Sequence, residues 1–229
     1  MVRPIKKKQI PNLQDAIKET AWRQIAEYGA PALSLRAIAR ELKITAPAIY
    51  NYFRDRDALV TALIIDAFTS FGDSQIAARD AVAEANLGGR FKAIGLAYRN
   101  WAHTYPQRYQ LIFGMPIPGY QGPPEKILPA SARSISALFS VVESFRAVGR
   151  LNVASAPPIK AEYKAHYERW RAQVGEIHPL SVFVAMIIWG RVHGVVSLEI
   201  QGNLPPFGKK GDSLYLSELD SIARQFIKE

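Results

Sequence analysis

The sequence of this 229-residue chain predicts an all-α fold, in which a small three-helix domain of the helix-turn-helix type precedes a larger helical bundle. Apolar residues recur at spacings of three and four through most of the chain, which is the period of an amphipathic helix. No pair of segments shows the alternation of paired strands, and no internal repeat is visible. The net charge of +9 is uneven, because residues 1–56 hold 11 Lys and Arg against 5 Asp and Glu.

Two short helices joined by a tight turn are predicted within residues 34–53, SLRAIARELKITAPAIYNYF. The first residue of this segment is a serine, a preferred N-cap. In the second helix, predicted over Ala46–Phe53, Thr45 is the expected cap, and Pro47 occupies the first turn, where its missing N–H costs little. Helices this short cannot each bury enough apolar surface alone. We therefore expect them to pack on each other and on a third helix, Leu13–Tyr28.

The chain after residue 56 reads as a bundle of longer helices. The expected helices are Asp57–Glu84, Arg90–Thr104, a short one through Tyr109 and Phe113, Ala130–Arg150, one opened by Pro157 and Pro158, one opened by Pro179, and Ser217–Ile227. Gly72 is expected to bend the first of them. The stretch Gly114–Pro129 is dense in Gly and Pro and predicts a long loop.

The helix opened by Pro179 is apolar nearly all round over roughly 20 residues, so it must be buried on several sides. We expect its outer face to meet a second subunit, with Val184 and Val195 in the interface. On the same helix, Gly190 is expected to face a cavity that a larger side chain would fill.

The second short helix carries polar side chains that have little structural use. Tyr50 and Tyr52 flank Asn51; phenolic hydroxyls reach phosphates, and an Asn side chain pairs bidentately with adenine. Ala46 and Ala48 are small enough to let the backbone approach a thymine methyl. This pattern indicates a DNA-reading helix. The predicted DNA-contacting set is Ser34, Arg36, Lys43, Thr45, Ala46, Pro47, Ala48, Tyr50, Asn51, Tyr52 and Arg56.

Basic residues close to this helix suit the phosphate backbone, because cations that displace condensed counterions bind DNA with strong salt dependence. Arg36, Lys43 and Arg56 are interpreted as phosphate anchors, the alternative being a solvated face. The amino-terminal residues Arg3 and Lys6–Lys8 leave two alternatives open. They either lie along a phosphate strand or an adjacent minor groove, as basic arms do, or form a solvated end.

Several classes of protein are excluded by what the sequence lacks. The absence of cysteine excludes a disulfide framework, a thiolate nucleophile and a cysteine-ligated metal site. His103, His166, His178 and His193 never occur three or four residues apart, so no metal site is predicted. No nucleophile-elbow, phosphate-loop or dinucleotide glycine pattern appears. We therefore expect neither an enzyme nor a cofactor.

The amino terminus is basic but is followed by no apolar h-region, which argues against a signal peptide. No run approaches the about 18 consecutive apolar residues expected of a membrane span. We therefore expect a soluble, cytoplasmic protein with no membrane contact.

Two segments, SLRAIARELKI and IYNYFRDRDALV, together resemble the DNA-binding domain of the TetR/AcrR family of bacterial transcriptional repressors. The second matches a family pattern of roughly Leu, Tyr, any residue, His, Phe, two variable residues, Lys, an acidic residue, any residue and Leu. Lys43 departs from the family, which usually has glycine at the tight turn; a left-handed backbone there would cost a lysine about 1 kcal/mol. Tyr52 replaces a common histidine, so a phosphate contact made through imidazole would pass to a phenol.

Two further segments, YPQRYQLIFG at 105–114 and WGRVHGVVSLEIQGNL at 189–204, resemble the C-terminal domain of the TetR subgroup that is named for its Trp, His and Gly residues. Together the resemblances imply a helix-turn-helix DNA-binding domain over residues 1–56, with its motif at 34–53. They imply a helical ligand-binding and dimerisation domain over residues 57–229.

Aromatic and sulfur-containing side chains of the bundle are candidates for an apolar ligand pocket with a few polar groups, the usual anatomy of a small-molecule site. The candidates are Trp101, Tyr105, Tyr109, Phe113, Met115, Met186, Trp189 and His193. Two readings of His193 stay open: a buried imidazole with a hydrogen-bond partner, or one polar group of the cavity. For the aromatic set, plain core packing is the alternative.

The sequence therefore predicts a homodimeric, ligand-responsive transcriptional regulator, most simply a repressor, whose partners are double-stranded operator DNA, a small, largely apolar effector and a second copy of the chain. Two-fold symmetry would place the recognition helices about 34 to 36 Å apart over a palindromic site. The long helix from Asp57 is the expected lever between effector and DNA. The competing hypothesis is a helical small-molecule binding protein whose basic amino terminus only solubilises it.

Overall fold

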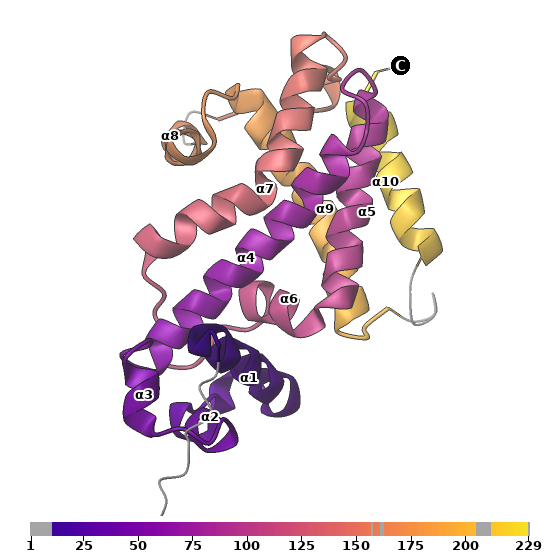
Figure 1. Ribbon diagram of the computed structural model, residues 1–229. Helices are drawn as coiled ribbons and strands as arrows, with labels where there is room; N and C mark the ends of the chain where they lie inside the picture. The colour runs from indigo at the N-terminus through magenta and orange to yellow at the C-terminus, as the bar shows by residue number, and fades with distance from the viewer. Residues whose placement is uncertain (1–10, 157, 161–162, 205–211, 229) are drawn as a thin grey trace, which may run out of the picture.

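The computed structural model describes residues 11–156, 158–160, 163–204 and 212–228, and its regular elements there are helices, which confirms the all-α prediction (Figure 1). Leu151 and Ile227 form an isolated antiparallel bridge. The basic residues Arg3 and Lys6–Lys8 lie outside the described residues, as does Pro157. In chain order the elements are α1 (Leu13–Tyr28), the 3-10 turn η1 (Ala30–Ala32), α2 (Leu35–Glu41), α3 (Ala46–Tyr50), α4 (Arg56–Asp80), α5 (Leu87–Thr104), α6 (Pro106–Phe113), α7 (Pro124–Ala147), η2 (Val153–Ser155), α8 (Tyr163–Val174), α9 (Pro179–Ile200) and α10 (Asp212–Phe226).

Helices α1–α3, which we call the head, gather at one end of the molecule, and α4 runs from the head into the remaining helices, which we call the body (Figure 1). The head packs around Ile17, Ile38 and Ile49, each of which is fully buried. Leu59 and Leu63 from the first turns of α4 belong to the same apolar cluster. The head and the start of α4 therefore share one core.

Gly72 of α4 marks a close approach between two helices. A Cβ added at this glycine would lie 3.0 Å from the carbonyl oxygen of Arg133 and 3.0 Å from the Cα of Ser134, both on α7. The glycine therefore lets α4 and α7 pack backbone to backbone. This packing accounts for the glycine, and the bend expected at Gly72 stays a prediction.

Several helix boundaries differ from the prediction. The loop expected over Gly114–Pro129 ends at Pro123, because α7 begins at Pro124 and carries Pro129 inside its first turns. Proline is favourable at a helix start, where the missing N–H has no intrahelical partner to lose. Helix α8 begins at Tyr163, and Pro158, which was expected to help open it, is not helical. Helix α10 begins five residues earlier than predicted, at Asp212.

Helix α9 packs against α7, α5 and α10. By length and composition it is apolar enough to cross a membrane, which for a single helix is weak evidence, and 39% of its most apolar 18-residue window is buried. Val184 is fully buried within the chain, so the prediction that it lies in a subunit interface is wrong. Gly190 is exposed, and a Cβ added there would meet nothing within 4 Å, so it does not face a cavity as expected.

Candidate DNA-reading face and effector groove

The turn between α2 and α3 is a Schellman motif with a lysine in the place usually taken by glycine. Lys43 has a φ of 55°, its N–H donates to the carbonyl of Arg40 (3.2 Å), and the next N–H, of Ile44, donates to the carbonyl of Ala39 (3.0 Å). At the other end of α2, the Ser34 hydroxyl accepts from the N–H of Ala37 at 3.4 Å, as its sequence predicts. Backbone groups at both ends of α2 are therefore hydrogen-bonded, although Lys43 has to adopt a left-handed backbone conformation that is unfavourable for a residue with a Cβ.

Helix α3 is five residues long and ends at Tyr50, three residues earlier than predicted. Thr45 occupies the N-cap position, but its side chain makes no capping hydrogen bond, contrary to expectation. Burial of Ile49 and Phe53 fixes the orientation of the helix and of the turn after it. This leaves Tyr50 and Tyr52 each 47% exposed.

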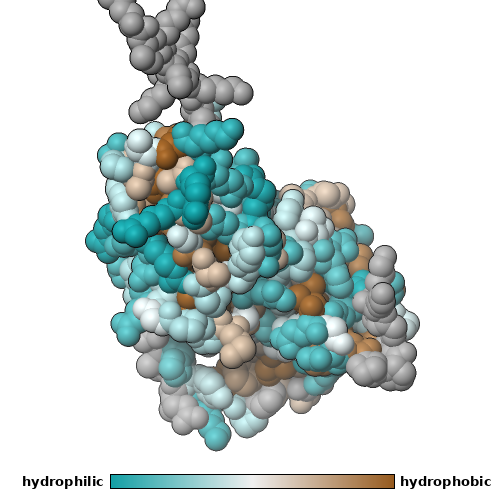
Figure 2. Space-filling view, turned by 90° about the horizontal axis from the view of Figure 1, so that it is seen from below, coloured by the Kyte–Doolittle hydropathy of each residue, from teal (hydrophilic) through white to brown (hydrophobic). Residues whose placement is uncertain are grey.

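Most of the predicted DNA-contacting side chains lie on the outside of the head. The exposed members are Arg36, Lys43, Thr45, Pro47, Tyr50, Asn51 and Tyr52, while Ser34, Ala46, Ala48 and Arg56 are half-buried. Figure 2 views the molecule from this end and shows a mainly hydrophilic surface over the head. The arrangement offers phenol, amide and cationic groups to a polyanion, with small side chains between them.

Arg56 stands apart from this set. Its Nε donates to the carbonyl of Leu33 (3.2 Å), and its Nη2 donates to the carbonyls of Ala30 (3.1 Å) and Pro31 (3.2 Å). The guanidinium therefore ties η1 and the start of α2 to the first turn of α4. This structural role argues against the phosphate anchor that the sequence suggested.

Six of the eight predicted pocket residues meet in one aromatic cluster in the body, formed by Trp101, Tyr105, Tyr109, Phe113, Trp189 and His193. The His193 ring stacks on Trp189, with 4.8 Å between their centroids. Trp101 and Tyr109 are buried in this cluster, Tyr105 is 39% exposed at its edge, and the cavity that borders Trp189 has a volume of only about 20 Å³. Core packing therefore describes Trp101 and Tyr109 in this conformation.

His193 is a half-buried imidazole with hydrogen-bond partners, which agrees with the first of its two predicted readings except in the extent of burial. Its Nδ1 lies 2.9 Å from the hydroxyl of Tyr98 and 3.0 Å from that of Tyr109, and its Nε2 lies 3.2 Å from the Ser197 hydroxyl. Burial lowers the pKa of His193 and raises the pKa values of Tyr98 and Tyr109. These groups are therefore neutral at neutral pH.

The remaining two pocket candidates lie elsewhere. Met115 is 91% exposed in the loop before α7, so its assignment to the pocket is wrong. Met186 lines a separate groove between α8 and α9 with a volume of about 690 Å³. The walls of the groove are mainly apolar and aromatic, with a few charged groups: Ile159, Lys160, Tyr163, His166, Tyr167, Glu168, Pro179, Val182, Phe183, Met186 and Ile187.

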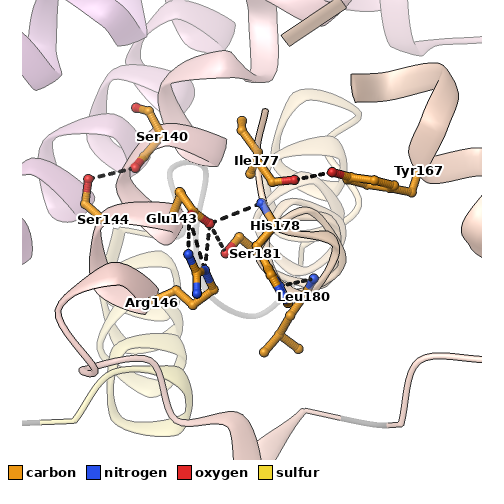
Figure 3. A network of polar contacts seen from close by, with 9 residues as sticks. All are labelled: Ser140, Glu143, Ser144, Arg146, Tyr167, Ile177, His178, Leu180 and Ser181. Atoms are coloured by element: carbon orange, nitrogen blue, oxygen red, sulfur yellow. Dashed lines mark hydrogen bonds and ion pairs between the residues drawn. The ribbon is translucent and has the colours of Figure 1, made fainter. Parts of the chain in front are cut away.

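A polar network holds the groove in shape at the junction of α7, α8 and α9 (Figure 3). The Glu143 carboxylate accepts from the Ser181 hydroxyl at 2.6 Å and from the guanidinium of Arg146, and these contacts lower its pKa. The hydroxyl of Tyr167 on α8 donates to the carbonyl of Ile177 at 2.6 Å. The network therefore fixes the turn between α8 and α9, and with it the width of the groove. Tyr163 and Tyr167 are four residues apart in the sequence, which places them on one side of α8, but this spacing does not indicate that they line an open groove beside α9.

Among the described residues, no group of three or more His, Asp or Glu side chains is placed to hold a metal ion. No arrangement of nucleophile, base and orienting group was predicted from the sequence. The chemistry that the described side chains offer is recognition of a polyanion at the head and of an apolar molecule at the body.

Comparison with known proteins places both parts of the chain. Residues 17–63 match the family of bacterial regulatory proteins of the TetR type, and residues 91–222 match the tetracyclin repressor-like C-terminal domain. HTH-type transcriptional regulators of Mycobacterium tuberculosis and Mycobacterium bovis are 34% identical over 194 residues, which cover 83% of this chain and 81% of each relative.

Solved structures agree. The crystal structure of the regulatory protein SCO4313 superposes with a TM-score of 0.72 at 34% identity, covering 93% of this chain and 98% of that one. A protein of unknown function from Rhodococcus sp. RHA1 superposes with a TM-score of 0.73 at 22% identity, covering 98% and 100%, and supports the fold alone. The finer assignment to the Trp-His-Gly subgroup stays a prediction. The chain belongs to the TetR family: it is a transcriptional regulator with a helix-turn-helix DNA-binding domain, and not an enzyme.

Proposed function

We propose that this regulator is a homodimeric repressor that binds a palindromic operator through α3 and leaves it when a small apolar molecule binds the body. The observation that carries the DNA-reading part is the exposure of Tyr50, Asn51 and Tyr52 around a helix whose other side is anchored by the buried Ile49. Exposed phenol rings keep apolar surface in contact with water and contribute nothing to packing of the core. Contact with DNA phosphates and base edges would account for these exposed side chains.

Dimerisation is supported by the outer face of α9. Gly190, Gly194 and Leu198 recur at helical spacing along this face; the two glycines would accept a Cβ without contact, and Leu198 is 44% exposed. Leu216 on the neighbouring α10 is 41% exposed. An uncovered apolar face of this kind is typical of an interface, and a two-fold axis would let the same face cover itself.

Replacing Leu198 by Arg tests the dimer, because it places a charge on the proposed interface without touching the core. Light scattering should show that the variant has half the mass of the parent at micromolar concentration, with an unchanged helical circular dichroism signal. Glu19→Arg, at an exposed position on α1 away from α9 and α10, serves as the control for a changed surface charge. A Leu198→Arg variant that keeps the parent mass would remove α9 from the interface.

The groove between α8 and α9 is our proposed effector site. Its volume lies within the range of small-molecule pockets, and its walls are largely apolar. The aromatic cluster, in contrast, has no comparable space in this conformation. Because α9 carries Met186 in the groove and His193 in the aromatic cluster, a ligand in the groove would act directly on the packing of the body core.

Release from DNA requires that the effector binds one conformation better than another, and the shift is limited by that difference in affinity. Helix α4 is the proposed lever, since its first turns share the core of the head and its later turns pack on α7. An operator-binding protein works where the chromosome is, so we place it in the cytoplasm.

Salt titration of DNA binding separates this proposal from a helical small-molecule binding protein that only carries a basic end. With an operator fragment selected from a random duplex library, affinity should fall roughly 10³-fold or more between 50 and 200 mM salt, and scrambled duplex should bind far more weakly. Equal affinity for selected and scrambled duplexes would refute sequence-specific regulation.

A further inference from the structure

The head and the body meet at a cation that lies between two aromatic rings. The guanidinium carbon of Arg108 on α6 lies 5.2 Å from the ring centroid of Trp22 on α1 and 4.7 Å from that of Tyr105. Trp22 is half-buried and packs against both the apolar cluster of the head and that of the body. The arginine is therefore in contact with one of the side chains at which the two cores join, the others being Ile112 and Phe113.

The stack continues into the body. The ring of Tyr105 lies 5.6 Å from that of Trp101, and Trp101 lies 4.8 Å from Phe71 on α4. One residue further along α6, Tyr109 is hydrogen-bonded to His193 on α9. Any shift of α6 that follows a change in the aromatic cluster therefore moves Arg108, and with it the surface on which α1 rests.

Within the described chain Arg108 has no ion-pair partner, which distinguishes it from a polar link between α1 and α4. That link is the ion pair between Lys18 and Asp66 on α4, at 2.8 Å, whose carboxylate is 40% exposed. An ion pair with a partly exposed carboxylate constrains orientation weakly and is screened by salt. The half-buried Arg108 guanidinium is instead attracted to the faces of two rings at once, one from α1 and one beside α6.

We infer that Arg108 is a positioning residue, which sets the angle of the head on the body by locking α1 to α6. The inference rests on the proposed function, because the operator readout needs the DNA-binding role of the head and the dimer, but it does not need the proposed effector. Without the stack, the head would remain folded on the first turns of α4 but would sample a wider range of angles. Operator binding would then lose the pre-organisation that holds two α3 helices at one spacing.

Distance measurements between head and body test this directly, and a chain without cysteine allows spin labels at chosen sites. Labels at Ala26→Cys on α1 and Lys92→Cys on α5 lie at exposed positions. Labelled protein is diluted into an excess of unlabelled protein, so that only distances within one chain register. Arg108→Met keeps the aliphatic stem and removes the cation; its distance distribution should be at least twice as wide as that of the parent.

Two comparison variants make the result specific. Arg108→Lys retains a cation over the rings and should recover most of the narrow distribution. Arg150→Met removes a guanidinium that lies over the ring of Phe145 in the body, at 5.7 Å, and should leave the distribution unchanged. If Arg108→Met unfolds, Trp22→Leu removes the ring on the other side of the stack while keeping an apolar side chain, and it should broaden the distribution in the same way.

Operator affinity is the second readout. Arg108→Met should bind the selected operator about tenfold more weakly than the parent at an unchanged unfolding midpoint, and Arg108→Lys should restore it. Unchanged widths in Arg108→Met and Trp22→Leu would overturn the inference. A parent protein that failed to select an operator would refute the proposed function alone, because the distance measurement does not depend on DNA.

Discussion

Replacing Arg56 by Met separates two roles that a basic residue beside a DNA-reading helix can have. Its guanidinium donates to the carbonyls of Leu33, Ala30 and Pro31, and the side chain is 29% exposed. Methionine keeps the apolar stem but donates to none of these carbonyls. If the role is structural, the free energy of unfolding changes; if the role is to contact phosphate, the salt dependence of DNA binding changes.

The expected loss of stability follows from the surroundings of the three carbonyls. A hydrogen bond from a charged donor contributes about 1.5–3 kcal/mol when its loss leaves a buried acceptor unpaired. Pro31 is exposed and Ala30 is half-buried, so water can replace the donor there, whereas Leu33 is 4% exposed. Only one of the three bonds is therefore lost in full. We expect Arg56→Met to lower the free energy of unfolding by about 2 kcal/mol.

Urea unfolding measures this loss, and the slope of log affinity against log salt measures the phosphate contacts. Arg56→Met should leave that slope within error of the parent. Arg36→Met, at an exposed position on α2, is the matched comparison: its stability should stay within about 0.5 kcal/mol while its slope falls by about one. An Arg56→Met protein of parental stability with a reduced slope would refute the structural reading.

The other predictions concern the head and the aromatic cluster. Tyr50→Ala and Asn51→Ala should each weaken operator binding by about 1–3 kcal/mol in an anisotropy titration while the melting temperature stays constant; a lost fold would show that they are core residues. Lys43→Gly should raise the free energy of unfolding in urea by about 1 kcal/mol, because the left-handed φ of 55° favours glycine, and should weaken DNA binding if the ammonium contacts phosphate; lower stability would contradict this. Burial lowers the pKa of His193, so below about pH 6.5 the unfolded chain binds more protons than the folded one, and the free energy of unfolding should fall there. In His193→Gln, the free energies of unfolding measured at pH 8 and at pH 5 should differ less than they do in the parent.

Local signals explain why the head could be predicted from the sequence. The Ser34 cap and the proline in the first turn of α3 each act within a few residues, and the structure shows both of them. The same reasoning missed the end of α3, because a turn that follows Tyr50 can continue the apolar spacing to Phe53 without remaining helical. The N-cap failed at Thr45 for a related reason: the residue type fits, but the side chain does not reach a free N–H.

The body shows what periodicity does not determine. Spacing indicates which side of a helix is apolar, but not whether the space between two apolar sides is filled. Trp101, Tyr109 and Trp189 lie in one aromatic cluster, as expected of a common site, but the cavity that borders Trp189 has a volume of only about 20 Å³. The groove between α8 and α9 is open because the turn between them is fixed by Glu143 on α7, a contact across 38 residues that has no signature in the sequence. Met186 belongs to the groove for that reason.

Helix α9 also shows that an apolar pattern does not determine which residues face which neighbour. A helix that is apolar all round must be covered all round, which correctly implied that several partners pack on it, but composition does not say which residues face which partner. Val184 was expected outside and is fully buried, whereas Gly190 was expected inside and is exposed. The two glycines explain the inversion. A residue without a side chain contributes least to a core, and on an outer face it allows another helix to approach closely, so Gly190 and Gly194 are better indicators of the uncovered side than any of the valines.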